Sequence, residues 1–254
     1  MSGSYLLYPW VNRLSSPYIS YKGRSLLLYN YTSDDNELPI HGYFFNTERK
    51  ITAINEDAHQ SCVTVTQYHK HPFPSFFEIF RLKKSELEIE TCFFNNTSGV
   101  QYFSYGYHPY LSLDGKIDSY SLDTNLFDII PLNDKYLPKT YILKNQVKYL
   151  FESNKEISIN HFDHCFTKDD SMTKSFVSIT NKNKTEKIVI ESKNEENFIP
   201  LNYFQIYTPK DRKSIAIEPL ASTGDVFSNP ISNPIVLYPG ERKSGKFSIL
   251  YESI

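Results

Sequence analysis

Cysteine is scarce in this sequence, and its scarcity limits what can hold the protein together. Only Cys62, Cys92 and Cys165 occur among 254 residues, and they are widely spaced. An odd set at such spacings supplies neither a disulfide framework nor a group of metal ligands. We therefore predict no metal site. The chain also shows no basic stretch followed by an apolar run at its start, so we expect no signal peptide and a reducing, cytoplasmic location.

Long apolar runs and an excess of one charge are missing too. No apolar run reaches the roughly 18 residues that a membrane-spanning helix needs. The formal net charge is -2, and no long block of like charge occurs. Nucleic acids and anionic membranes attract strongly basic segments. The sequence therefore predicts neither a nucleic acid nor a membrane as a partner.

The familiar sequence signatures of catalysis are absent as well. The chain has no G-x-S-x-G, no Walker pattern, no H-E-x-x-H and no G-x-G-x-x-G. His69 and His71 would share one face of a strand, but no cysteine or acidic residue is spaced nearby to complete a zinc site. We expect no cofactor.

Aromatic residues, in contrast, are abundant. The chain has 20 tyrosines and 18 phenylalanines, and aromatic residues make up 15% of it. Tyrosine and phenylalanine favour strands. Clefts lined with tyrosine suit sugars, because the C–H faces of a sugar stack on the rings while its hydroxyls bind polar groups.

Short alternating segments recur about every ten residues, and long amphipathic helical patterns are lacking. The predicted strands occupy residues 18–28 (two strands around a turn), 58–68, 76–82, 87–94, 101–113 (with interruptions), 117–128, 174–180, 187–192, 204–208, 215–217 and 246–251. A helix is only weakly indicated, within residues 140–159. This pattern is typical of an all-β sandwich or barrel. Because no linker or repeat is evident, we predict a single domain over residues 1–254.

Four ionisable residues stand where a predicted strand ends or breaks, which is where β proteins commonly build their sites. They are His41, His108, Asp163 and Glu218. Taken singly each has an ordinary explanation: His41 before a glycine can be a turn residue, and Asp163 can cap a turn. Glu218 is less ordinary, because apolar residues surround it. A carboxylate there must be paired, or its pKa rises.

His108 is held at a break in its strand. Pro109 lacks a backbone N–H, so the ladder cannot continue normally there, and it biases His108 towards an extended backbone. Tyr105, Tyr107 and Tyr110 are expected to surround the imidazole. The ordinary interpretation is a histidine that hydrogen-bonds a neighbour in a tyrosine-rich core. The alternative is a group that exchanges protons near neutral pH.

An ordered series of short motifs decides between these alternatives. The motifs are Asn12-Arg13-Leu14, Leu38-Pro39-Ile40-His41-Gly42, Gly106-Tyr107-His108-Pro109-Tyr110, Asp163-His164-Cys165-Phe166, Gln205-Ile206-Tyr207-Thr208 and Ile217-Glu218-Pro219, with Leu237-Tyr238-Pro239-Gly240-Glu241 near the end. In this order they resemble the aldose 1-epimerase (galactose mutarotase) family. The resemblance runs from about residue 10 to residue 250, and it rests on the order of the motifs, since no single one is specific.

The resemblance implies an all-β, β-supersandwich fold and a set of roles. Glu218 would be the catalytic base and His108 the catalytic acid. The residues that would hold the sugar are Arg13, His41 and Asp163, with Gln205 nearby. The chain departs from the family at two points: family members usually have further strands before the Asn-Arg element, and the tryptophan common after the His-Gly motif is not evident in residues 43–55.

The implied reaction interconverts the α and β anomers of an aldohexose by acid/base ring opening and closure. It needs a carboxylate and an imidazolium, but no metal or nucleotide. The rival functions are a non-catalytic carbohydrate-binding protein of the same fold, a hexose-phosphate epimerase and a glycosidase. Arginine is sparse and lysine scattered, which disfavours a phosphorylated substrate. The sequence leaves the oligomeric state open.

Overall fold

The structure is a computed structural model that describes residues 3–45, 47–66, 72–150, 152, 155–168 and 172–254. Across these residues the only helical elements are two 3-10 turns, η1 (Ile117–Ser119) and η2 (Val147–Tyr149). The weak helical signal in residues 140–159 corresponds to η2. The strand predicted over residues 117–128 is wrong in part, because its first residues form η1. None of the helices in the described part of the chain is long and apolar enough to cross a membrane.

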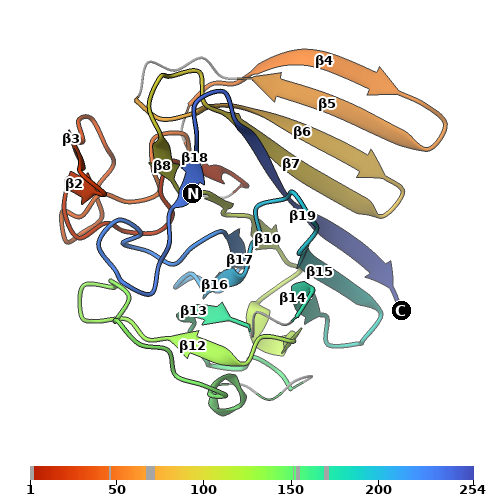
Figure 1. Cartoon of the computed structure of the whole chain (residues 1–254). Helices are drawn as coiled ribbons and strands as arrows, with labels where there is room; N and C mark the ends of the chain where they lie inside the picture. Colours follow the sequence, from red (N-terminus) through yellow and green to blue (C-terminus); the bar gives the residue numbers. More distant parts are fainter. Residues whose placement is uncertain (1–2, 46, 67–71, 151, 153–154, 169–171) are drawn as a thin grey trace.

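Most strands belong to two antiparallel sheets, of which the larger runs down one side of the molecule (Figure 1). Its order is β11 (Ser121–Thr124), β14 (Lys174–Thr180), β15 (Glu186–Lys193), β19 (Arg242–Ser253), β7 (Glu86–Phe94), β6 (Ser75–Lys83), β5 (Gln60–Thr66) and β4 (Lys50–Glu56). The hairpin of β6 and β7 is confirmed, as is β5, although residues 67–68 of that predicted strand lie outside the described residues. β4 had no strand prediction; all seven of its residues are exposed, so no buried face marks it in the sequence.

The second sheet, called here the site sheet, carries Asp163, Gln205 and Glu218, and His108 lies between two of its strands. Its order is β1 (Leu6–Leu7), β9 (Gly106–Tyr107), β17 (Ser214–Leu220), β16 (Tyr203–Tyr207), β13 (Asp163–Thr167) and β12 (Asp128–Ile130), with β10 (Tyr110–Ser112) also on β17. Two two-stranded sheets complete the fold: the hairpin of β2 (Tyr18–Tyr21) with β3 (Arg24–Leu27), and the pair of β8 (Gln101–Phe103) with β18 (Ile235–Leu237), which are distant in sequence. The strands predicted at residues 18–28 are thereby confirmed.

Aromatic side chains fill the space between the two sheets. The ring of Tyr107 on β9 contacts that of Phe247 on β19 at 5.1 Å, and Tyr105 contacts Phe93 on β7 at 4.9 Å. All four rings are buried. Fully burying such a side chain contributes about 1.5–3 kcal/mol. The expectation that Tyr105 and Tyr107 surround His108 is therefore wrong. Successive residues of a strand point to opposite faces, so the rings of Tyr105 and Tyr107 enter the core while His108 points to the other face of the sheet.

The strand is interrupted at His108-Pro109, but the two pieces on either side, β9 and β10, pair with β17 in one common register. β9 and β10 pair with the same edge of β17, one on each side of the break. The pairs are Gly106 with Leu220 and Tyr110 with Ala216. Both pairs follow one register, which places His108 opposite Glu218. Residues that lie directly opposite in an antiparallel sheet project from the same face.

Glu218 does not stand at the end of its strand, as the sequence suggested, because β17 continues to Leu220. Proline usually weakens a strand since it cannot donate to the ladder. Here the N–H groups of Ile217 and Ala221 point to the edge that carries the break. The N–H that Pro219 lacks would point to that same edge, so the strand passes through the proline and Glu218 lies in its interior.

Candidate active site

The centre of the site is one row of side chains across the site sheet. His108 lies opposite Glu218, and Glu218 lies opposite Gln205 on β16. The row continues from Gln205 to Cys165 on β13. His108 Nε2 lies 3.2 Å from Glu218 Oε1, and both side chains are almost completely buried. Backbone pairing between strands therefore fixes the separation of the two ionisable groups.

Asp163 belongs to the same face of the sheet, because it precedes Cys165 by two residues on β13. Gln205 Nε2 donates a hydrogen bond of 2.6 Å to Asp163 Oδ1. This bond leaves the second oxygen of the Asp163 carboxylate for another donor. The amide and the carboxylate thus form a fixed polar pair beside Glu218.

Arg13 and His41 come from two connecting segments that pair with each other above the sheet. Arg13 forms an antiparallel bridge with Ile40, and the N–H of His41 donates to the carbonyl of Asn12 at 3.0 Å. Arg13 Nε binds a carboxylate oxygen of Asp34, which holds the guanidinium in place. Its contacts with Asp34 and the face of Tyr136 leave part of the guanidinium facing the cleft.

The turn that carries His41 depends on Gly42. His41 has φ 62 and Gly42 has φ 73, a region that L side chains rarely adopt. A Cβ on Gly42 would lie 1.9 Å from the carbonyl oxygen of Tyr8. Only glycine allows the chain to pass this close, and strained backbone of this kind is frequent at functional sites.

These elements enclose a cleft of about 230 Å³. Its walls are Tyr5, Asn12, Arg13, Ile40, His41, His108, Tyr110, Asp163, Gln205, Tyr207 and Glu218. All six residues that the sequence singled out as a site line it. The sequence missed Tyr5, Asn12 and Tyr207 as site residues. Tyr207 alone carried a usable signal, since it lies two residues from Gln205 in a predicted strand and so shares its face.

Several buried polar atoms of the cleft have no hydrogen-bond partner among the described residues. They include Glu218 Oε2, Gln205 Oε1 and His41 Nδ1. A buried polar atom without a partner costs about 1–3 kcal/mol. Those three atoms surround one cavity, where a polar ligand could supply the missing hydrogen bonds.

Burial shifts the pKa values of the central pair in opposite directions. Loss of hydration lowers the pKa of His108 to about 4, and it raises the pKa of Glu218 well above its usual range, helped by the nearby Asp163. Without a ligand, the pair therefore favours a neutral imidazole beside a protonated carboxyl group. The sequence suggested the charged form, and burial is the reason for the difference.

Burial also shifts the pKa values of Asp163 and His41, which lie beside the central pair. Burial raises the pKa of Asp163, against the opposing effects of Arg13 and of the hydrogen bond from Gln205. Burial also lowers the pKa of His41 well below its ordinary value, and the proximity of His108 lowers it further. A neutral His41 can donate through one ring nitrogen and accept through the other.

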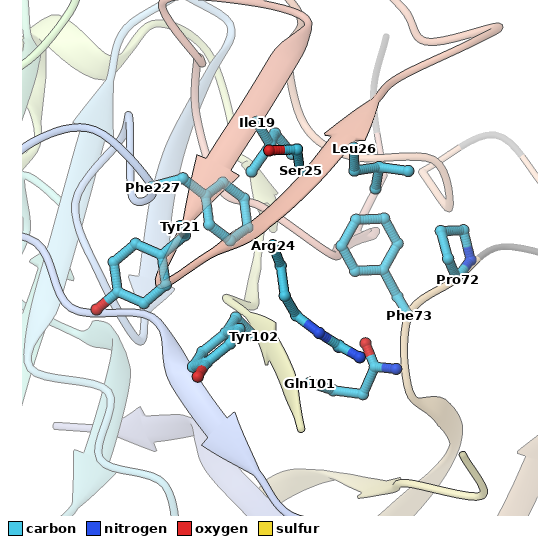
Figure 2. A pocket seen from close by; sticks show the side chains of 10 residues that line it. All are labelled: Ile19, Tyr21, Arg24, Ser25, Leu26, Pro72, Phe73, Gln101, Tyr102 and Phe227. Atoms are coloured by element: carbon cyan, nitrogen blue, oxygen red, sulfur yellow. The ribbon is translucent and has the colours of Figure 1, made fainter. Parts of the chain in front are cut away.

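A second cavity, of about 310 Å³, lies apart from these residues, between β2, β3, β8 and Phe227 (Figure 2). Its walls are mostly apolar. Its arginine, Arg24, binds the carbonyl of Val100.

The described residues contain no cluster of three or more His, Cys, Asp or Glu side chains that could hold a metal ion. His69 and His71 lie outside the described residues.

The family of the chain follows from comparison with known proteins. The family model for aldose 1-epimerase matches residues 4–250. The chain therefore belongs to the aldose 1-epimerase family, as the order of its motifs predicts. A comparison with curated proteins gave no match.

Solved structures share the fold at low sequence identity. A galactose mutarotase-like protein from Clostridium acetobutylicum is 19% identical with a TM-score of 0.80, and the match covers 99% of this chain and 80% of that one. A galactose mutarotase related enzyme from Lactobacillus acidophilus is 18% identical with a TM-score of 0.74, covering 98% and 83%. Galactose 1-epimerase from Lactobacillus acidophilus NCFM is 13% identical with a TM-score of 0.75, covering 98% and 79%. The all-β, β-supersandwich prediction is confirmed.

Proposed function

We propose that this protein is an aldose 1-epimerase that interconverts the α and β anomers of a free aldohexose. The observation that carries the proposal is the contact of 3.2 Å between His108 Nε2 and Glu218 Oε1 at the base of a polar cleft. Mutarotation needs one group that removes a proton from the C1 hydroxyl and one that gives a proton to the ring oxygen. Both oxygens are bonded to C1, so the two groups must lie close together.

The proposed reaction begins with a carboxylate on Glu218 and an imidazolium on His108. Glu218 takes the proton of the C1 hydroxyl while His108 protonates the ring oxygen, and the C1–O5 bond breaks to give the open-chain aldehyde. The aldehyde rotates about C1–C2. Closure then returns the proton from Glu218 to the anomeric oxygen and the proton from the ring oxygen to His108, on the opposite face.

Ring opening leaves Glu218 protonated and His108 neutral. This is the protonation state that burial favours in the cleft. The charged and neutral forms of the pair hold the same number of protons, so a single transfer interconverts them. Burial therefore favours the state that accompanies the open-chain sugar. Hydrogen bonds from bound hydroxyls would stabilise the charged state that starts the cycle.

The remaining predicted residues are proposed to hold the sugar. Arg13 and His41 donate hydrogen bonds from the wall of the cleft, and Asp163 accepts from hydroxyl groups through the oxygen that Gln205 leaves free. The Gln205 side chain keeps an unpartnered carbonyl oxygen, which suits another hydroxyl. Charge-assisted hydrogen bonds of this kind are the strong ones in a wet cleft.

The cleft is poorly suited to a sugar phosphate. Of the described residues that line it, Arg13 is the only lysine or arginine, and its guanidinium is already engaged by Asp34. A phosphate with almost two negative charges normally takes several cationic donors. A free aldohexose is therefore the better substrate.

Two further proposals concern the protein as a whole. The free thiols Cys62, Cys92 and Cys165 support a location in the cytoplasm. The hydrophobic core that both sheets share supports a single domain.

Polarimetry tests the proposal. Freshly dissolved α-D-glucose and α-D-galactose are followed to equilibrium with and without the protein, and the enzyme should accelerate the decay of optical rotation in proportion to its concentration. Binding of either sugar by calorimetry without any acceleration would instead identify a non-catalytic carbohydrate-binding protein. Acceleration restricted to glucose 6-phosphate would identify a hexose-phosphate epimerase.

A further inference from the structure

Tyr5 continues the row that contains the central pair. β1 pairs with the edge of β9 opposite to the one that faces β17, with Leu6 opposite Tyr107. The same register places Tyr5 beside His108. The carbonyl of Tyr5 accepts a hydrogen bond of 2.9 Å from the N–H of His108, and the ring of Tyr5 is stacked on the imidazole at 4.8 Å with 20° between the planes.

The segment before β1 supports the chain at the break from the edge opposite to β17. Pro109 lacks the N–H that would face β17, and the N–H groups of its two neighbours face the N-terminal segment. Tyr5 accepts from the N–H of His108, and the carbonyl of Gly3 accepts from the N–H of Tyr110 at 2.9 Å. The N-terminal segment therefore holds the residues on both sides of the proline.

The ring of Tyr5 is enclosed by other rings. Besides the stacked His108, it contacts Phe45 at 5.7 Å and the edge of His41 at 6.1 Å. The face that touches His108 is covered and cannot stack on a sugar. Tyr5 thus contacts both imidazoles of the cleft, which also contact each other at 5.3 Å, and it limits how each can rotate.

We propose that Tyr5 is a positioning residue that holds the His108 imidazole with Nε2 directed at Glu218. The inference rests on the proposed function, because it is the acid role of His108 that gives the ring orientation its importance. The backbone contact fixes where the residue lies, and the stacked ring fixes how the imidazole is turned. A misplacement of about 1 Å of a reacting group can cost roughly 100-fold in rate.

Tyr5 also keeps water from the imidazole. The titratable groups that face His108 are Glu218 on β17, Tyr110 on β10, His41 from the connecting segment and Tyr5 itself. Burial among them is the main reason for the low pKa of His108. Removing the Tyr5 ring would admit water to one face of the imidazole and raise that pKa towards the ordinary value.

Kinetics of Tyr5 variants provide the first test. Tyr5→Phe keeps the stacked ring and should keep kcat within about threefold of the parent rate, whereas Tyr5→Leu should lower kcat roughly 10- to 100-fold with little change in KM. Tyr21→Leu is the matched control, because Tyr21 is also a partly buried tyrosine with ring contacts, to Tyr102 and Phe227, but lies beside the other cavity (Figure 2). It should leave kcat unchanged. Equal kcat for Tyr5→Leu and Tyr21→Leu would overturn the proposal.

A titration of His108 by NMR of the imidazole nitrogens gives a result that does not depend on activity. In Tyr5→Ala the pKa of His108 should rise by about one unit, a tenfold change in proton affinity, while Tyr21→Ala leaves it in place. An unchanged His108 titration in Tyr5→Ala would contradict the proposal. If the parent protein accelerates no mutarotation yet the titration shifts, the proposed function fails and the placement of His108 by Tyr5 stands.

Discussion

His108 and Glu218 form a cross-strand pair across a gap in the site sheet. They lie opposite each other by the register that β9 and β10 share on β17, and their side chains approach to 3.2 Å. Pairing within the sheet thus sets the distance between the proposed acid and the proposed base. Arg13 and His41 come from connecting segments, so the proposed contacts with the sugar can vary without disturbing the pair.

Replacing Glu218 by glutamine should leave the fold intact and slow mutarotation by roughly 10²–10⁴, which is the usual contribution of one positioned proton-transfer group. Glutamine has the same shape but cannot accept the C1 hydroxyl proton. The rate is measured by polarimetry at saturating sugar, and the fold by circular dichroism.

Glu78→Gln is the control for that change. Glu78 is also fully buried, but it lies on β6 in the larger sheet and pairs with Arg49 at 2.9 Å. This variant should retain the parent rate. If both variants were equally active, Glu218 would have no part in the proton transfer.

The dependence of kcat/KM on pH should be bell-shaped, because the active pair holds one proton. The acidic limb belongs to His108: its lowered pKa of about 4 means that a second proton binds, and activity falls, only as the pH drops towards that value. The alkaline limb belongs to Glu218, whose raised pKa delays the loss of the last proton. From the ordinary pKa values of the two groups, the carboxylate would give the acidic limb and the imidazole the alkaline limb; burial reverses this assignment.

His108→Asn should then cost far more in kcat than in KM, since it removes a proton donor of the transition state and keeps the contacts of Arg13, His41 and Asp163. It should also replace the bell by a single limb, because the residual kcat/KM then needs an ionised Glu218 and falls as the pH drops below the raised pKa of that carboxyl group. Initial rates across the pH range, measured for the parent and the variant, check both points. A raised KM with normal kcat would show that His108 only binds the sugar.

Local pattern was sufficient to predict much of the architecture. The hairpin of β6 and β7 alternates polar and apolar residues around a short polar turn, and both strands were expected almost at their observed ends. The six candidate residues that line the cleft were found through their order along the chain, since their separations in sequence say nothing about distances in space. It was the resemblance to a family that predicted that these six residues share one site.

The rest of the site depends on pairing between distant segments, which local pattern does not encode. β1 has two residues, too few for an alternating signal, so nothing in the sequence indicated that Tyr5 stacks on His108. Glu218 was placed at a strand end because Pro219 follows it. Strand β17 nevertheless continues past Pro219. The N–H that Pro219 lacks would point to the edge of β17 where β9 and β10 are interrupted at Pro109.

Treatment with a chelator should leave mutarotation unchanged. The proposed reaction moves only protons, and the cleft offers no group of three ligand side chains among its described residues. The protein is dialysed against EDTA, assayed, and its metal content is measured by mass spectrometry. Loss of activity that zinc or calcium restores would contradict this expectation.

Gly42→Ala should destabilise the protein by more than about 1 kcal/mol and impair the site, because the new Cβ meets the Tyr8 carbonyl and the backbone has φ 73. Gly115→Ala is the control that separates the steric contact of the new Cβ from the strain of a positive φ. Gly115 also has positive φ, at 82, but a Cβ there meets nothing within 4 Å. Urea unfolding should show the larger loss for Gly42→Ala, and only that variant should lose activity, through displacement of His41.

Glu78 should make the protein less stable as the pH rises from about 4.5 to 7. Burial raises the pKa of its carboxyl group from 4.5 to about 7, against the opposing effect of Arg49. Between these values the unfolded chain has released the proton while the folded protein still holds it, so rising pH favours unfolding. A shift of this size corresponds to about 3 kcal/mol, at 1.36 kcal/mol for each pKa unit.

The difference in unfolding free energy between the parent and Glu78→Gln isolates this effect from other titrating groups. Urea unfolding of both proteins at several pH values gives the difference, and the parent should lose stability relative to the variant across the window from about 4.5 to 7. Below pH 4.5 the difference should be constant, because both states of the parent are then protonated at Glu78. A difference that stays flat up to pH 8 would mean that the folded protein holds Glu78 ionised, with the ion pair to Arg49 outweighing its burial.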